Sequence, residues 1–190
     1  ETPTVAGLAA RVDALLSAGA AAQAPPLVPV PRDGSPLPLS FAQQRLWFLD
    51  RMEPGSPAYN MPAALRFRGA LDADALRRSF TALVARHEAL RTVFPAVRGV
   101  PAQVVGELLP FPLEEVDLRG LGAGEREAEL LRRARADATA PFDLAAGPLL
   151  RATLLRLDEQ EHALLVAMHH IVSDGWSVGL LVREVSALYA

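Results

Sequence analysis

The chain contains no cysteine and no lysine, and its only isoleucine is Ile171. Without cysteine it can form no disulfide, no thiol nucleophile and no zinc–thiolate centre. All 19 cationic residues are arginine and they face 22 acidic residues, so the net charge of −3 gives nucleic-acid binding little electrostatic support. No apolar run is long enough to span a membrane. We therefore expect neither a nucleic-acid partner nor a membrane partner.

The composition is that of a globular protein, with 51% hydrophobic and 22% charged residues. A chain of 190 residues accommodates one domain and a shorter additional segment. It begins at Glu1, without an initiating methionine or a charged-then-apolar leader. We therefore expect a segment of a longer, cytoplasmic protein.

The N-terminal part divides from the rest by composition. Residues 1–18 predict an amphipathic helix with Thr4 as its N-cap, because apolar residues recur there at steps of three and four. Residues 19–36 are rich in proline and small residues, which is typical of an extended linker. We expect the main domain to occupy residues 37–190.

The main domain mixes helical and strand patterns. Ser40 begins a capping-box pattern, and Asp72 precedes a long amphipathic segment, so both predict helix starts. The predicted helices begin at 41 and at 73 and cover 125–138 and 180–188; the predicted strands cover 63–68, 113–116, 149–157 and 163–168, with a hairpin formed by 91–97 and 100–105. This mixture predicts an α/β or α+β fold.

The densest group of chemically capable residues follows the last predicted strand. An apolar run leads into His169 and His170, and Asp174 and Gly175 follow. Side chains of a strand alternate between faces, so only one of the two histidines can enter a given pocket. Histidine suits proton transfer near neutral pH. Two alternatives remain: histidines that only stabilise a strand end, and a metal site, for which further ligands are not evident.

A second group, RHEALRTVF, lies where the long helix ends and contains Arg86 and Arg91. One of these arginines could form an ion pair with Asp174, because a carboxylate inside a fold needs a partner. The alternative is that a positive charge simply stabilises the end of its helix.

Three segments, SFAQQRLWFL, RHEALRTVF and MHHIVSDGWS, resemble in this order the first three core motifs of condensation domains of nonribosomal peptide synthetases. The third contains the complete HHxxxDG signature. The resemblance runs from about Leu37 to Ala190 and implies a chloramphenicol-acetyltransferase-like α/β fold of the α+β sandwich type. It covers the N-terminal lobe only. Residues 1–18 resemble the last helix of a peptidyl carrier domain.

The resemblance implies that the chain takes part in peptide-bond formation between two carrier-bound thioesters. His170 would have the central role, as a base or by positioning the amine, and His169 and Asp174 would be structural. Gly175 would keep the substrate tunnel clear. No cofactor or metal would bind directly; phosphopantetheine would be carried by partner carrier proteins.

The implied partners are upstream and downstream carrier domains, a C-terminal lobe and a following adenylation domain. We expect the 190 residues to fold but to be inactive alone, because the family's tunnel lies between two lobes. The alternatives are a non-catalytic docking or structural lobe and a related acyltransferase or epimerisation-type member of the superfamily. Residues 40–50 favour a donor ending in a D-residue, although the donor's configuration stays open.

Overall fold

The computed structural model describes residues 4–17, 26, 28–30 and 36–190. The chain divides into two compact units, Glu1–Ser35 and Pro36–Ala190. In the first, helix α1 (Val5–Ser17) begins as predicted, because the Gly7 backbone N–H donates to the Thr4 hydroxyl at 3.1 Å. The apolar stripe of α1 is exposed. Most of the predicted linker, residues 19–36, lies outside the described residues. No helix in the described ranges is long and apolar enough to cross a membrane.

The second unit is built on a four-stranded sheet with the order β1-β8-β7-β6. The strands are β1 (Asn60–Arg68), β6 (Glu114–Asp117), β7 (Leu150–Asp158) and β8 (Glu161–His169). β8 is antiparallel to both of its neighbours, whereas β6 runs parallel to β7. Every residue of β8 after Glu161 is buried, which explains why its sequence is nearly continuous in apolar residues.

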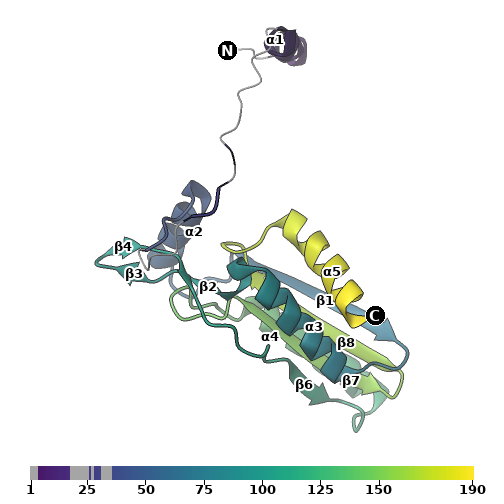
Figure 1. Ribbon diagram of the computed structural model, residues 1–190. Helices are drawn as coiled ribbons and strands as arrows, with labels where there is room; N and C mark the ends of the chain where they lie inside the picture. The colour runs from purple at the N-terminus through teal and green to yellow at the C-terminus, as the bar shows by residue number, and fades with distance from the viewer. Residues whose placement is uncertain (1–3, 18–25, 27, 31–35) are drawn as a thin grey trace. The chain divides into compact units, whose positions relative to one another are not determined.

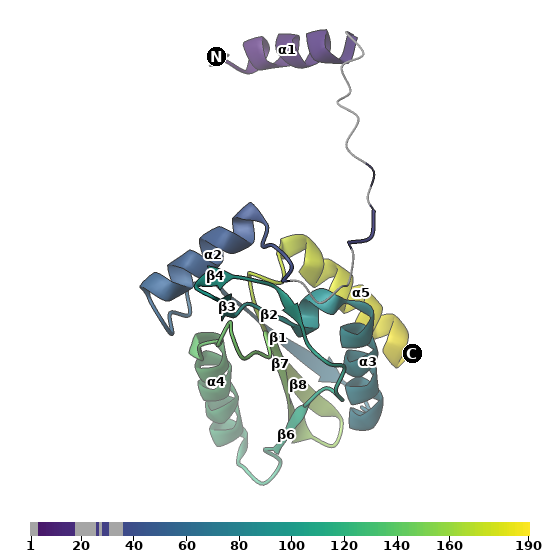
Figure 2. The ribbon, with the colours of Figure 1, turned by 60° about the vertical axis from the view of Figure 1, so that its left-hand side comes forward.

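Helices cover both faces of this sheet. α3 (Ala73–Arg86) and α5 (Gly175–Tyr189) lie side by side on one face (Figure 1). α4 (Ala123–Thr139) covers the opposite face (Figure 2). Because side chains alternate along a strand, β8 directs even-numbered residues such as Leu164 toward α3 and odd-numbered ones such as Leu165 toward α4.

A third hydrophobic cluster lies at the end of the sheet where β8 finishes. In it α2 (Phe41–Met52) packs against Phe94. Phe94 lies between the short strands β2 (Thr92–Val93) and β3 (Ala96–Val97); the 3-10 helix η1 (Glu88–Arg91) precedes them, and β4 (Val100–Pro101) and β5 (Val104–Val105) follow. The buried members of the cluster are Leu39, Phe94, Phe142, Leu144, Leu149, Ala167 and Ile171. Because Ala167 and Ile171 belong to this cluster, the end of β8 is packed firmly against it.

The capping predictions are confirmed. Ser40 and Gln43 form the reciprocal capping box of α2, and Asp72 accepts a hydrogen bond from the Ala75 N–H at the start of α3. The predicted hairpin turns at Arg98 and Gly99, which have φ angles of 53° and 82°. The prediction for the last helix is wrong at its start: α5 begins at Gly175 rather than Leu180, because Asp174 caps it.

Candidate functional site

The candidate site is the loop that connects β8 to α5. β8 ends at His169, which is only 4% exposed, and the next residue, His170, is exposed to solvent. This opposite burial is the arrangement that strand alternation predicts. The His170 backbone N–H donates to the Tyr59 carbonyl at 2.9 Å, so the loop is also tied to the chain entering β1.

His169 is a hydrogen-bonded residue of the core. Its Nδ1 accepts a hydrogen bond from the Ile171 N–H at 3.1 Å, and the ring of Phe142 meets it edge-on at a centroid distance of 6.1 Å. Burial, together with the nearby His170, lowers the pKa of His169 to about 4. His169 is therefore neutral at pH 7, and because Nδ1 accepts, its proton resides on Nε2.

His170 holds its proton on the other ring nitrogen. Its Nδ1 lies 2.6 Å from the carbonyl oxygen of Ser173. A carbonyl oxygen can only accept, so Nδ1 is the donor, and the neutral ring carries its free lone pair on Nε2. No hydrogen-bond partner of Nε2 is found among residues 36–190. An exposed imidazole in this tautomer can accept a hydrogen bond or a proton from a substrate.

The predicted ion pair of Asp174 with Arg86 or Arg91 is wrong. The Asp174 carboxylate accepts hydrogen bonds from the Ser177 N–H at 2.8 Å and the Ser177 hydroxyl at 2.6 Å. These two bonds lower the pKa of Asp174. Because Asp174 is exposed and caps α5, its charge needs no buried arginine.

The two arginines have other partners. Arg86 lies 3.7 Å from Glu184 of α5, and Arg91 donates to the Gly106 carbonyl at 2.6 Å and to Glu88 at 3.3 Å. Between them His87 contacts Glu184 at 2.7 Å. The second motif therefore joins α3 to α5, which carries the capped end of the histidine loop.

Gly175 has open space around it in this unit. Apart from its chain neighbours and the backbone of its own helix, a Cβ atom built on Gly175 would meet no atom of the described residues within 4 Å. Its neighbour Trp176 is also open to solvent, with 82% of its surface exposed. The packing of the described residues therefore does not itself require glycine here, and the role of Gly175 stays a prediction.

The sequence did not single out Ser173 or Tyr59, both of which hold the histidine loop. Ser173 supplies the carbonyl that binds His170, and Tyr59 supplies the carbonyl that binds the His170 backbone. Both contacts use backbone atoms, so no residue-type pattern indicated them. The Asp174–Ser177 contact did have a signal, since aspartate three residues before serine is typical of a helix N-terminus. No group of three or more metal-ligating side chains occurs in the described ranges.

Comparison with known protein families gives one consistent result. The family model named Condensation domain matches residues 35–190. A linear gramicidin synthase protein from Brevibacillus parabrevis is 48% identical over 189 residues, which is 100% of this chain and 2% of that protein. Phosphinothricin tripeptide synthetase PhsC from Streptomyces viridochromogenes is 50% identical over 174 residues, covering 91% of this chain and 16% of that protein.

Solved structures show the same fold. The starter condensation domain of rhizomide synthetase superposes with a TM-score of 0.74 at 24% identity, over 82% of this chain and 37% of that one. A four-domain nonribosomal peptide synthetase bound to AMP and glycine gives 0.72 at 25% identity, over 90% of this chain and 13% of that one. The chain thus spans a small fraction of its relatives' length.

Proposed function

This chain belongs to the condensation-domain family of nonribosomal peptide synthetases, whose members form amide bonds, and from that premise we propose that it supplies the histidine site for peptide-bond formation. The substrates are a donor acyl or peptidyl thioester and an acceptor aminoacyl thioester. The acceptor's α-amine attacks the donor carbonyl carbon, so that a C–N bond forms and the donor C–S bond breaks. The donor thiolate leaves and takes up the proton that the amine gives up.

The observation that carries the proposal is the exposed His170 with its free Nε2 lone pair. Nε2 accepts a hydrogen bond from the attacking amine and holds its proton as the C–N bond forms. A base positioned in this way contributes a factor of about 10²–10⁴ to a rate. Tethering of both substrates contributes further, because it makes the encounter nearly intramolecular. The thioester is already activated, so the reaction needs no nucleotide or metal.

His169, Asp174 and Gly175 support His170 without taking part in the chemistry. His169 anchors the end of β8 in the core, and Asp174 fixes the start of α5. Gly175 leaves room for substrate beside the exposed imidazole, which agrees with the open space around its Cα. Arg86 and Arg91 act in the scaffold through Glu184, Glu88 and Gly106, not through Asp174.

The substrates arrive on phosphopantetheine arms of upstream and downstream carrier domains. Helix α1 is the last helix of the upstream carrier, residues 19–36 are the linker, and residues 37–190 are the N-terminal lobe. Support comes from the gramicidin synthase match, which extends over the whole chain although the family model begins at residue 35. A second lobe and an adenylation domain complete the module. Residues 40–50 favour a donor that ends in a D-residue, and the donor's configuration stays open.

The test is a substrate-omission experiment. A polypeptide that contains this chain within a complete condensation domain is mixed with one donor-loaded and one acceptor-loaded carrier, and the products are identified by mass spectrometry. We expect a dipeptidyl thioester on the acceptor carrier only when both loaded carriers are present. Binding of both carriers without product would support a docking lobe, and epimerised donor without amide would support the epimerisation-type alternative.

A further inference from the structure

The loop around His170 contains a side chain whose role the proposed chemistry does not use. Ser173 is 7% exposed, and its hydroxyl oxygen lies 3.2 Å from the His169 carbonyl oxygen and 3.4 Å from Met61 Sδ. The hydroxyl proton therefore has acceptors on two sides. Water does not compete for it, because the side chain is buried.

The hydroxyl and the carbonyl of Ser173 act on opposite sides of the same histidine. The hydroxyl bonds the residue before His170, and the carbonyl accepts from His170 Nδ1 at 2.6 Å. The bond from the Ser173 hydroxyl to His169 closes the loop, so it holds the Ser173 carbonyl where Nδ1 can reach it. The other end of the loop is fixed independently, since Asp174 caps α5.

We propose that Ser173 is a positioning residue that fixes the tautomer and ring orientation of His170. An unrestrained imidazole in water prefers to carry its proton on Nε2, which would remove the lone pair that faces the amine. The Ser173 carbonyl opposes that preference because it accepts only from a protonated Nδ1. The hydroxyl keeps this carbonyl in place. The inference rests on the proposed function for its catalytic consequence, but not for its structural claim.

The neighbouring histidine provides an internal reference. His169 accepts at Nδ1 from the Ile171 N–H, so its proton lies on Nε2. The two adjacent histidines therefore hold opposite tautomers. The chain has only four histidines, so their ring nitrogens can be resolved and assigned individually.

The experiment is ¹⁵N NMR of the 190-residue chain with labelled histidine at pH 8.5, where an ordinary imidazole is neutral. In the unmodified chain we expect His170 to show a protonated Nδ1 and an unprotonated Nε2, and His169 the reverse. In Ser173→Ala we expect the His170 pattern to move toward a protonated Nε2, while the pattern of His169 stays unchanged. Ser173→Thr, which keeps the hydroxyl, is expected to retain the original His170 pattern.

Ser186→Ala is the matched control. The Ser186 hydroxyl donates to the Val182 carbonyl at 2.7 Å on the exposed side of α5, away from the loop. We expect this variant to change neither histidine. An unchanged His170 pattern in Ser173→Ala overturns the proposal, and so does loss of the folded spectrum in that variant, because Ser173 would then be a general structural residue.

The catalytic consequence is measured separately in the complete condensation domain. One neutral hydrogen bond corresponds to a factor of about three to ten. We expect Ser173→Ala to lower kcat by that factor at nearly constant KM, and Ser173→Thr to restore it. If the tautomer changes but the unmodified domain forms no amide, the proposed function fails and the structural assignment of Ser173 stands. If the unmodified domain forms amide but Ser173→Ala leaves the His170 tautomer unchanged, the structural assignment of Ser173 fails and the proposed function stands.

Discussion

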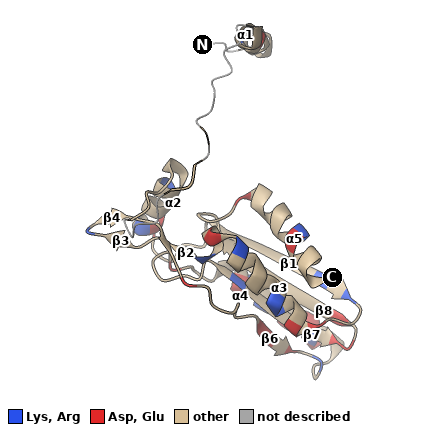
Figure 3. Ribbon diagram, in the orientation of Figure 1, with Lys and Arg blue, Asp and Glu red and all other residues tan. Residues whose placement is uncertain are grey.

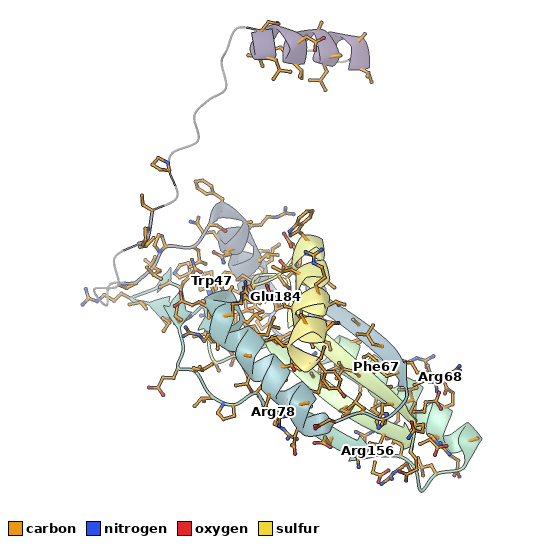
Figure 4. All side chains as sticks on the ribbon, turned by 45° about the vertical axis from the view of Figure 1, so that its right-hand side comes forward. Trp47, Phe67, Arg68, Arg78, Arg156 and Glu184 are labelled. Atoms are coloured by element: carbon orange, nitrogen blue, oxygen red, sulfur yellow. The ribbon has the colours of Figure 1, made fainter. Side chains whose placement is uncertain are left out.

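A histidine lies near each end of β8, and the two have different surroundings. At its start His162 is 3% exposed, and its buried Nδ1 has no hydrogen-bond partner among the described residues. At its far end His170 is exposed, and its Nε2 is open to solvent-borne partners. Figure 4 labels Phe67, Arg68 and Arg156 at the end where β8 begins.

The polar contacts at the two ends also differ in kind. Around the start of β8, acidic and basic side chains form surface ion pairs, including Arg66–Glu161 and Arg119–Glu159. Figure 3 marks the acidic and basic positions along the ribbon. The loop at the far end is held instead by hydrogen bonds that mostly involve backbone groups. Exposed ion pairs are mobile and screened by salt, whereas backbone hydrogen bonds are directional. The site that we propose therefore lies at the end where hydrogen bonds hold an imidazole, and not at the end that carries a dense set of charges.

The sequence predicted the elements better than their contacts. Capping patterns at Ser40 and Asp72 placed α2 and α3 correctly, because a cap is a local interaction between neighbours in sequence. The pairing of β6 with β7 in parallel had no local signal, since a sheet's order depends on contacts between distant segments. The expected contact between Arg91 and Asp174 was wrong for the same reason, because the sequence does not show which distant segments lie close together.

For the site, alternation predicted that the two histidines face different surroundings, and the family resemblance selected His170, but neither predicted what holds it. The bonds of His170 to Tyr59 and Ser173 end on carbonyl oxygens, which every residue has. Which carbonyl oxygen accepts each bond depends on the path of the loop in the folded chain, so the residue types do not predict these bonds. The prediction for Asp174 was wrong because the last helix was expected to begin at Leu180. With α5 beginning at Gly175, Asp174 is its N-cap and needs no arginine.

The largest expected effect is that of His170→Ala on the rate. In the complete condensation domain we expect amide formation to slow by about 10²–10⁴, because the acceptor for the amine's proton is removed. His162→Asn is the matched substitution at the other end of β8, and its rate should be roughly unchanged. The rate of amide formation is measured by mass spectrometry under single-turnover conditions. An equal loss of rate from both substitutions would show that His170 has no special role compared with His162.

A large effect on stability is expected from acidification. The pKa of His169 is about 4 in the folded chain against 6.5 for an ordinary histidine, so below pH 6.5 the unfolded chain binds the additional proton. The neutral, buried His169 therefore contributes about 3 kcal/mol to the free energy of unfolding above pH 6.5, and this contribution declines as the pH falls toward 4. The pKa of His162, also lowered chiefly by burial, acts in the same direction.

Urea unfolding between pH 4 and 8 measures this dependence. His169→Asn keeps an acceptor for the Ile171 N–H but cannot titrate, so its free energy of unfolding should vary much less with pH. If the variant and the unmodified chain have the same slope, His169 is not the buried group that titrates.

A smaller effect is expected for the cap of α5. Asp174→Ala removes the acceptor of the Ser177 N–H and should lower Tm by about 2–4 °C. Asp174→Asn keeps an acceptor oxygen and should stay near the original Tm. Calorimetry of the three chains checks this, and a destabilised Asp174→Asn would show that the charge itself is needed.

The smallest effect belongs to the ion pairs at the start of β8. Arg119 contacts Asp117 and Glu159, and the Glu159 side chain is 77% exposed. We expect Arg119→Ala to shift Tm by no more than about 1 °C at physiological salt. If Arg119→Ala lowered Tm as much as Asp174→Ala does, the ion pairs at the start of β8 would stabilise the fold as much as the cap of α5.

The most direct test of the central claim asks which unpaired imidazole nitrogen meets the amine. A complete condensation domain with ¹⁵N-labelled histidine is titrated with a soluble aminoacyl thioester, and the ring nitrogens of His162 and His170 are followed by NMR. The account predicts a saturable shift at His170 Nε2 and none at His162 Nδ1. A saturable shift at His162, or an unchanged His170 Nε2 in a domain that turns the thioester over, would contradict it.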